Sequence, residues 1–292
     1  MPPIRRATAL AEAGRYPGDA TLAAIRNALA DPDPLVRTAA AEATGTLPPP
    51  ARAPLLSPLL ADPVRNVRIT AARLLVDAHE HLGADAPRWD QAIAEYRQVQ
   101  AALAERPESH MNLAGLERDL GSAEAARREV EAALALAPGY PPALVMQSEF
   151  LAASGQPAEA VAMLQAALAR QPDSGLLLHG LGLAQVRAGD RAGALRSLKA
   201  AWDKSPQDAL YGFVYAVALH DTGDAKGAIA QLDRVLARHP EDRDSAMTAV
   251  RYRVEAGDQA GAQAIAERWL KVDPGEPSLG RARTGEPKQG GS

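Results

Sequence analysis

One unit of sequence recurs every 34 residues between positions 107 and 276, and this period constrains the fold more than any other feature. Each unit carries a glycine near its middle, an alanine five residues later and a proline at its end. The members are Gly121, Gly155, Gly189, Gly223 and Gly257; Ala126, Ala160, Ala194, Ala228 and Ala262; and Pro138, Pro172, Pro206, Pro240 and Pro274. Three residue types in one unbroken period indicate an array of five repeats.

The third unit shows what these positions do. Gly189 ends a first helix, because glycine enters the left-handed conformation without a steric penalty. A second helix is predicted over 191–204, where the small Ala194 lets two helix backbones approach closely. Pro206 closes the unit because proline cannot continue a helix interior. Each unit is therefore predicted to be a helical hairpin whose apolar side is buried only by stacking on its neighbours. In the first helix, one face at helical spacing holds Leu178, Leu181, Gly182 and Gln185.

This pattern resembles the tetratricopeptide repeat (TPR). The residues of the third unit that match are Leu178, Leu181-Gly182, Ala194 and Pro206. Two positions depart from the pattern, because Gln185 stands where the family has Tyr and Leu198 where it has an aromatic residue. The resemblance covers 107–276 and implies a solenoid whose first helices line a concave groove.

A second period, of 31 residues, runs through residues 1–82. Asp31-Pro32 returns as Asp62-Pro63, and Val36-Arg37 returns as Val67-Arg68. Ile4-Arg5 begins what looks like an incomplete earlier copy, and short helices are predicted at 19–30 and 50–61. The pattern resembles HEAT repeats. That resemblance implies structural roles, in a ladder between repeats, for Asp31, Arg37, Asp62 and Arg68.

The remaining segments complete the predicted domain organisation. Residues 83–106 are predicted to form a linker (83–88) and one amphipathic joining helix (89–106). Residues 277–292, rich in Gly, Pro, Ser and charge, are predicted to be a disordered tail. The fold class is thus all-α, an α-solenoid of HEAT-like repeats (1–82) followed by five TPR hairpins (107–276).

Composition excludes several classes of function. The chain has no cysteine, which excludes disulfides, thiolate metal sites and covalently attached haem. Its 32 basic residues are scattered among acids, so no basic stripe for nucleic acid is expected. No apolar run approaches the ~20 residues of a membrane span. The first 30 residues do not resemble a signal peptide, so a cytoplasmic location is expected for the chain as it stands.

No catalytic, cofactor or metal motif is found. A nucleophile elbow and a phosphate-binding loop are both missing, and the Gly180-Leu181-Gly182 run falls within a helix, where glycine serves packing. His79 and His81 are two residues apart, which points them to different sides of a helix, whereas a metal site favours i, i+4 spacing. We therefore predict a protein that is not an enzyme and has no cofactor.

The first helices carry a second apolar stripe, which in a TPR solenoid lines the groove. Two interpretations stay open. The stripe binds an extended segment or amphipathic helix of a partner, with Phe213 and the leucines as anchors, or it packs between repeats. The first is our leading prediction, with a protein or peptide partner and an unknown oligomeric state. The predicted groove is apolar in its middle units and more polar at its start; its residues are Met111, Arg118, Val145, Glu149, Leu176, His179, Leu183, Val186, Leu210, Phe213, Val217 and His220.

A narrower resemblance suggests an alternative function. The order of repeats and the stretches 216–220 and 238–244 resemble the haem-free C-terminal part of bacterial multihaem c-type cytochromes. This chain departs from them in having no Cys-x-x-Cys-His site. The resemblance implies an accessory docking segment of an electron-transfer protein, periplasmic if the chain is a fragment of an exported protein. A weaker alternative is a HEAT-type pigment lyase.

Overall fold

The computed structural model describes residues 1–14 and 18–272, and every regular element within these ranges is a helix. The predicted all-α fold class is therefore confirmed. The chain divides into two compact units, Met1–Pro138 and Gly139–Ser292. The predicted tail at 277–292 lies outside the described residues.

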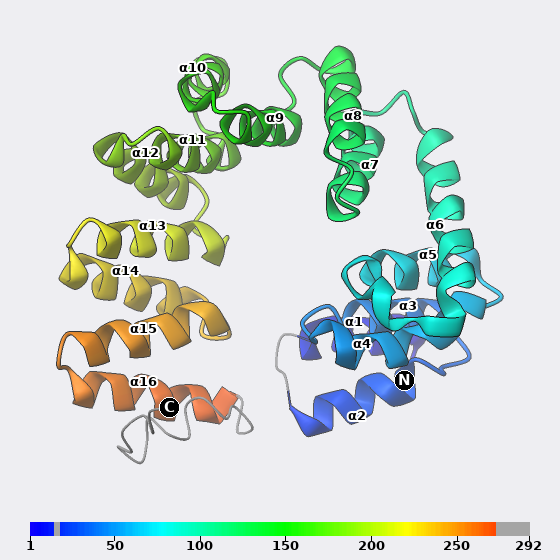
Figure 1. Ribbon diagram of the computed structural model, residues 1–292. Helices are drawn as coiled ribbons and strands as arrows, with labels where there is room; N and C mark the ends of the chain where they lie inside the picture. Colours follow the sequence, from blue (N-terminus) through cyan, green and yellow to red (C-terminus); the bar gives the residue numbers. More distant parts are fainter. Residues whose placement is uncertain (15–17, 273–292) are drawn as a thin grey trace, which may run out of the picture. The chain divides into compact units, whose positions relative to one another are not determined.

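The N-terminal unit contains short helices followed by one longer hairpin (Figure 1). Its first elements are α1 (Pro3–Ala13), α2 (Asp19–Ala28), α3 (Pro34–Glu42), α4 (Pro49–Leu56), the 3-10 helix η1 (Ser57–Ala61) and α5 (Arg65–Leu74). These are followed by the 3-10 helices η2 (Val76–His81) and η3 (Gly83–Asp85), then by α6 (Ala86–Ala101) and the hairpin α7 (Pro107–Asp119) with α8 (Ala123–Leu136).

A ladder of ion pairs joins the short repeats of this unit, as the HEAT resemblance implies. The guanidinium of Arg37 donates to both carboxylate oxygens of Asp62, at 2.7 and 2.9 Å. Burial raises the pKa of Asp62, but hydrogen bonds from Arg37 and from the Val64 N–H outweigh it and hold the pKa below its usual value. Arg6 pairs in the same way with Asp31. Arg68 continues the ladder, although its partner is Glu95 of α6.

Three predicted helices have other bounds in the structure. The helix predicted over 19–30 is α2, which ends at Ala28. The helix predicted over 50–61 is α-helical only to Leu56 and continues as η1, where Pro58 lacks the N–H that an α-helix would donate to the carbonyl of Pro54. The joining helix predicted over 89–106 is α6, which begins three residues earlier, at Ala86, and ends at Ala101. Residue 106 is extended because it precedes Pro107, and the chain turns before it.

The C-terminal unit is a stack of four hairpins (Figure 1). They are α9 (Pro141–Ala153) with α10 (Pro157–Leu168), α11 (Gly175–Arg187) with α12 (Arg191–Lys204), α13 (Ala209–Asp221) with α14 (Ala225–Arg238), and α15 (Arg243–Glu255) with α16 (Gln259–Val272). The bounds of α12 confirm the helix predicted over 191–204. We call the pairs hairpins 2 to 5, because α7 and α8 form the first unit of the 34-residue period.

Each of these hairpins turns at the periodic glycine. The φ angle is +81° at Gly189 and +91° at Gly223, a region that favours glycine. In hairpins 3 to 5 the second helix then begins at an aspartate cap, whereas Gln156 of hairpin 2 forms no side-chain cap. The carboxylates of Asp190 and Asp224 each accept an N–H of the first helical turn at 2.8 Å. The sequence period thus fixes the turn in all four hairpins and the start of the second helix in three of them.

Small residues hold the two helices of a hairpin together. The periodic alanines of the C-terminal unit are all buried. A Cβ on Gly182 would lie 2.6 Å from the Leu198 side chain, so a larger residue would separate α11 from α12. Gln185, at the position where the TPR pattern has Tyr, instead accepts a buried hydrogen bond from Ser197 at 2.7 Å. The predicted packing roles of glycine and alanine are confirmed.

Candidate functional site

The predicted groove residues are divided between the two units. Met111, partly buried, and Arg118, exposed beside Asp119, lie on α7 of the N-terminal unit. The other ten lie on first helices of the C-terminal unit, where the site is built.

Two predicted groove histidines pack against the following hairpin. His179 of α11 is 7% exposed and stacks on Tyr211 of α13, with ring centroids 4.7 Å apart. Burial lowers the pKa of His179, opposed by the charge of Asp208. His220 of α13 stacks on Tyr252 of α15 at 3.7 Å. These rings join consecutive hairpins, so the packing interpretation describes His179 better than partner binding does.

Val145 of α9 is also engaged within the chain. A Cβ on Gly180 of α11 would lie 2.9 Å from a methyl group of Val145, and α9 and α11 pack closely there. The aromatic ring of Phe213 packs against the core of hairpins 4 and 5. Leu176 and Glu149 are partly buried, and Leu210 is 53% exposed.

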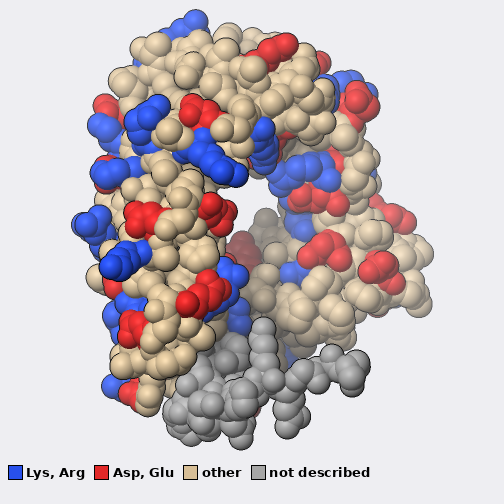
Figure 2. All heavy atoms as spheres, turned by 60° about the vertical axis from the view of Figure 1, so that its left-hand side comes forward, with Lys and Arg blue, Asp and Glu red and all other residues tan. Residues whose placement is uncertain are grey.

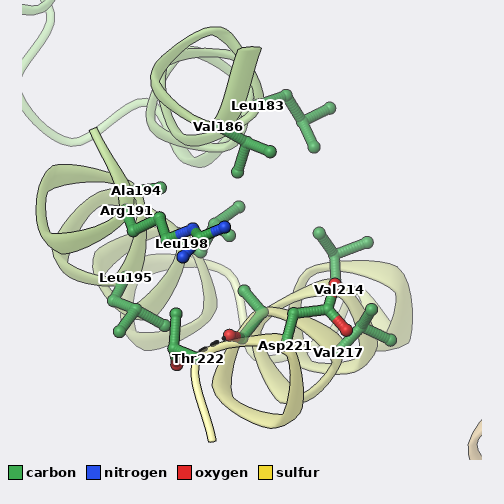
Figure 3. A pocket seen from close by; sticks show the side chains of 11 residues that line it. Leu183, Val186, Arg191, Ala194, Leu195, Leu198, Val214, Val217, Asp221 and Thr222 are labelled. Carbon is green, nitrogen blue, oxygen red and sulfur yellow. Dashed lines mark hydrogen bonds between the residues drawn. The ribbon is translucent and has the colours of Figure 1, made fainter. Parts of the chain in front are cut away.

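The three remaining predicted residues, Leu183, Val186 and Val217, line an open cavity of about 330 Å³ between hairpins 3 and 4. Figure 3 shows α11 and α12 on one side of this cavity and α13 on the other. Val186 is 50% exposed. The wall is completed by residues outside the predicted groove set, which are Arg191, Ala194, Leu195, Leu198, Val214, Ala218, Asp221 and Thr222.

The cavity has a cause in the sequence. Gly180 lets α9 approach α11, whereas the residue 34 positions later is Val214, whose larger side chain lines the cavity. Val186 and Ala218, toward the other end of these helices, also line the cavity and do not fill it. A recess therefore forms between two first helices.

Two opposite charges line the cavity beside its apolar wall. Arg191 is the first residue of α12 and Asp221 is the last residue of α13. Neither makes an ion pair or a side-chain hydrogen bond with another residue of the described chain. The cavity thus combines an aliphatic interior with one available cation and one available anion.

Within residues 1–14 and 18–272, no group of three or more histidine, aspartate or glutamate side chains could hold a metal ion. His79, considered above for metal binding, stacks on Trp89 with ring centroids 5.4 Å apart. On the face drawn in Figure 2, basic and acidic side chains are interspersed over the C-terminal unit.

Within residues 1–14 and 18–272, no helix is both long enough and apolar enough to cross a bilayer.

Comparisons with known families agree with the two sequence periods. A model described as HEAT repeats matches residues 1–76. Models described as tetratricopeptide repeat match 84–141, and also 117–186, 151–216 and 185–249. No curated protein was found to match the chain.

Several solved structures share the fold. PilW, a widely conserved type IV pilus biogenesis factor, is 18% identical over 75% of this chain and 98% of its own, with a TM-score of 0.53. The human IFIT1 dimer with PPP-AAAA is 15% identical over 90% of this chain and 68% of its own, also with a TM-score of 0.53. YrrB, a TPR protein with an unusual peptide-binding site, is 20% identical over 65% of this chain and 97% of its own, with a TM-score of 0.43. At these identities, the two structures with a TM-score of 0.53 show the fold alone.

Proposed function

Because the chain is built from HEAT repeats followed by tetratricopeptide repeats, we propose that it is a non-enzymatic scaffold that binds a segment of another protein in the cavity between α11 and α13. The observation that carries this proposal is the cavity itself. Stacked hairpins bury their apolar faces against one another, yet here Leu183, Val186 and Val217 remain accessible.

The size of the cavity suits an anchoring side chain. Its volume of about 330 Å³ is at the low end of the ~300–1,000 Å³ typical of small-molecule pockets. A protein segment that inserts one aliphatic side chain would bury the apolar wall, and a few residues buried in well-packed pockets supply most of the binding energy of an interface. The accessory role beside a multihaem cytochrome stays a prediction from resemblance.

The proposal can be tested with peptides selected on the full chain. A displayed library of random 16-residue peptides would be enriched on the wild-type protein, and the enriched peptides synthesised with a fluorescent label. Val217→Asp places a charge in the apolar wall and should weaken their binding, measured by anisotropy, at least tenfold. Leu136→Asp is the matched control, because Leu136 is an exposed apolar residue at the end of α8, in the other unit.

Circular dichroism should show that both variants keep the helicity of the wild type. Failure to enrich any peptide that Val217→Asp releases, or equal affinities for Val217→Asp and Leu136→Asp, would remove this cavity as the binding site.

A further inference from the structure

The two charges that line the cavity stand at helix ends where they are unfavourable. A helix carries partial positive charge at its N-terminus and partial negative charge at its C-terminus. Arg191 places a cation at the N-terminus of α12, and Asp221 places an anion at the C-terminus of α13. Neither charge is compensated by an ion pair in the described chain. Local helix stability therefore does not explain either residue.

The equivalent residues of the other hairpins differ. The residues that begin the second helices elsewhere are uncharged; they are Ala123, Pro157, Ala225 and Gln259. Two other first helices also end in an acidic residue, but both acids have partners. Glu255 accepts a hydrogen bond from His220 at 3.0 Å, and Asp119 lies 3.7 Å from the guanidinium of Arg73. Among these, only the charges at the cavity are left unpaired.

We infer that the partner segment carries an aliphatic anchor residue flanked by an acidic residue on one side and a basic residue on the other. The inference rests on the proposed function. The aliphatic side chain fills the space between Leu183 and Val217, the partner carboxylate pairs with Arg191, and the partner cation pairs with Asp221. Each partner charge also offsets the unfavourable interaction of Arg191 or Asp221 with its own helix end.

The arrangement of charges fixes the direction of the bound segment. Arg191 comes from the hairpin 3 side of the cavity and Asp221 from the hairpin 4 side (Figure 3). A segment with its acidic and basic residues exchanged would place like charges together, which is a repulsive contact that discriminates between sequences. The same pairing makes binding dependent on salt, because charges exposed to solvent are screened.

The experiment exchanges the charges on both sides. A labelled peptide that is enriched on the full-length wild type, and that Val217→Asp releases, would be made in its original form and with its acidic and basic residues swapped. Affinities for both forms would be measured on the wild type and on the double variant Arg191→Glu with Asp221→Lys. We expect the wild type to prefer the original peptide at least tenfold and the double variant to prefer the swapped peptide.

The outcomes separate the two proposals. If peptides are lost with Val217→Asp but bind equally well in both charge forms to both proteins, the apolar site stands and the charge pattern is wrong. If enriched peptides lack paired acidic and basic residues, the charge pattern is also wrong. If no peptide is sensitive to Val217→Asp, the proposed function fails and this inference fails with it.

Discussion

The interface between hairpins 3 and 4 and the interface between hairpins 4 and 5 use equivalent positions but differ in what fills them. His220 and Tyr252 are the residues 34 positions after Val186 and Ala218. In the later interface, the histidine and tyrosine rings stack at 3.7 Å with an interplanar angle of 4°. In the earlier interface, valine and alanine line a cavity. At these equivalent positions, the later interface holds a stacked pair of rings and the earlier one holds a cavity.

The other ends of the same helices show the reverse arrangement. His179 stacks on Tyr211 between hairpins 3 and 4, whereas the residues 34 positions later are Phe213 and Ser245. The rings thus join α11 to α13 near their N-terminal ends and leave the C-terminal ends apart. A repeat array can therefore form a recess without any change in its 34-residue period, when its large rings stand at different positions along successive interfaces.

Removing the stack between hairpins 4 and 5 should have the largest effect. Tyr252 is 2% exposed, and truncation of a buried aromatic residue costs about 3–5 kcal/mol. We expect Tyr252→Ala to lower the free energy of unfolding by that amount in urea titrations followed by circular dichroism. Tyr252→Phe keeps the ring and should lose much less. Equal losses for the two variants would show that the ring is not what fills this interface.

Transferring the stack to the earlier interface should close the cavity. The double variant Val186→His with Ala218→Tyr copies the later interface, and its rings would occupy the space where we place the partner anchor. Peptides enriched on the wild type should bind it at least tenfold more weakly, which is about 1.4 kcal/mol. Val186→His alone is the control, because a single ring at an exposed position has no ring to stack on. If the double variant bound these peptides as tightly as the wild type does, the cavity would not be their binding site.

The sequence predicts the hairpins well because the determinants of each hairpin are local. Gly189 sets its own φ, Asp190 caps the helix that follows it, and Ala194 packs within its own unit. The same reasoning identifies the side of each first helix that does not pack inside the hairpin. The residues Leu183, Val186 and Val217 were found in this way.

The contacts that each residue makes on this second side of the first helices could not be predicted. One helix pattern does not reveal that His179 stacks on a tyrosine while Val186 lines a cavity together with an alanine, because the tyrosine and the alanine belong to the next unit. The contribution of Arg191 was missed for a related reason, since it lies on a second helix. The sequence nevertheless contains a signal for the cavity. Aligning the units by their period shows that Val186 and Ala218 are smaller than the residues that follow them by 34 positions.

The histidine between hairpins 3 and 4 should make stability depend on pH. Burial lowers the pKa of His179 in the folded chain, while the unfolded chain takes its proton near pH 6.5. The unfolded state therefore binds more protons below that pH, so the free energy of unfolding should fall as the pH drops below about 6.5 and reach its full value above it. His179→Phe, which copies Phe213, should remove this part of the dependence.

The measurement compares urea unfolding of the wild type and His179→Phe at several pH values between 5 and 8. Taking the difference between the two proteins cancels the titration of the other histidines. A difference that stays constant over this range would mean that His179 can be protonated without loss of the stack on Tyr211.

The smallest expected effect is an increase in stability when the charges at the cavity are reversed. Arg191→Glu places an anion at the N-terminus of α12, and Asp221→Lys places a cation at the C-terminus of α13. Each change should raise the free energy of unfolding by about 0.3–1 kcal/mol at low salt, and less at high salt. Gln259→Glu is the control, at the position of α16 that corresponds to Arg191. Its gain in stability should be smaller, because this change adds an anion but removes no cation.

Greater stability of Arg191→Glu together with weaker peptide binding would mean that Arg191 binds a partner at a cost to the stability of its own helix. Lower stability of the variants would instead mean that Arg191 and Asp221 stabilise the fold. The interface between hairpins 3 and 4 would then differ from the interface between hairpins 4 and 5 in packing alone.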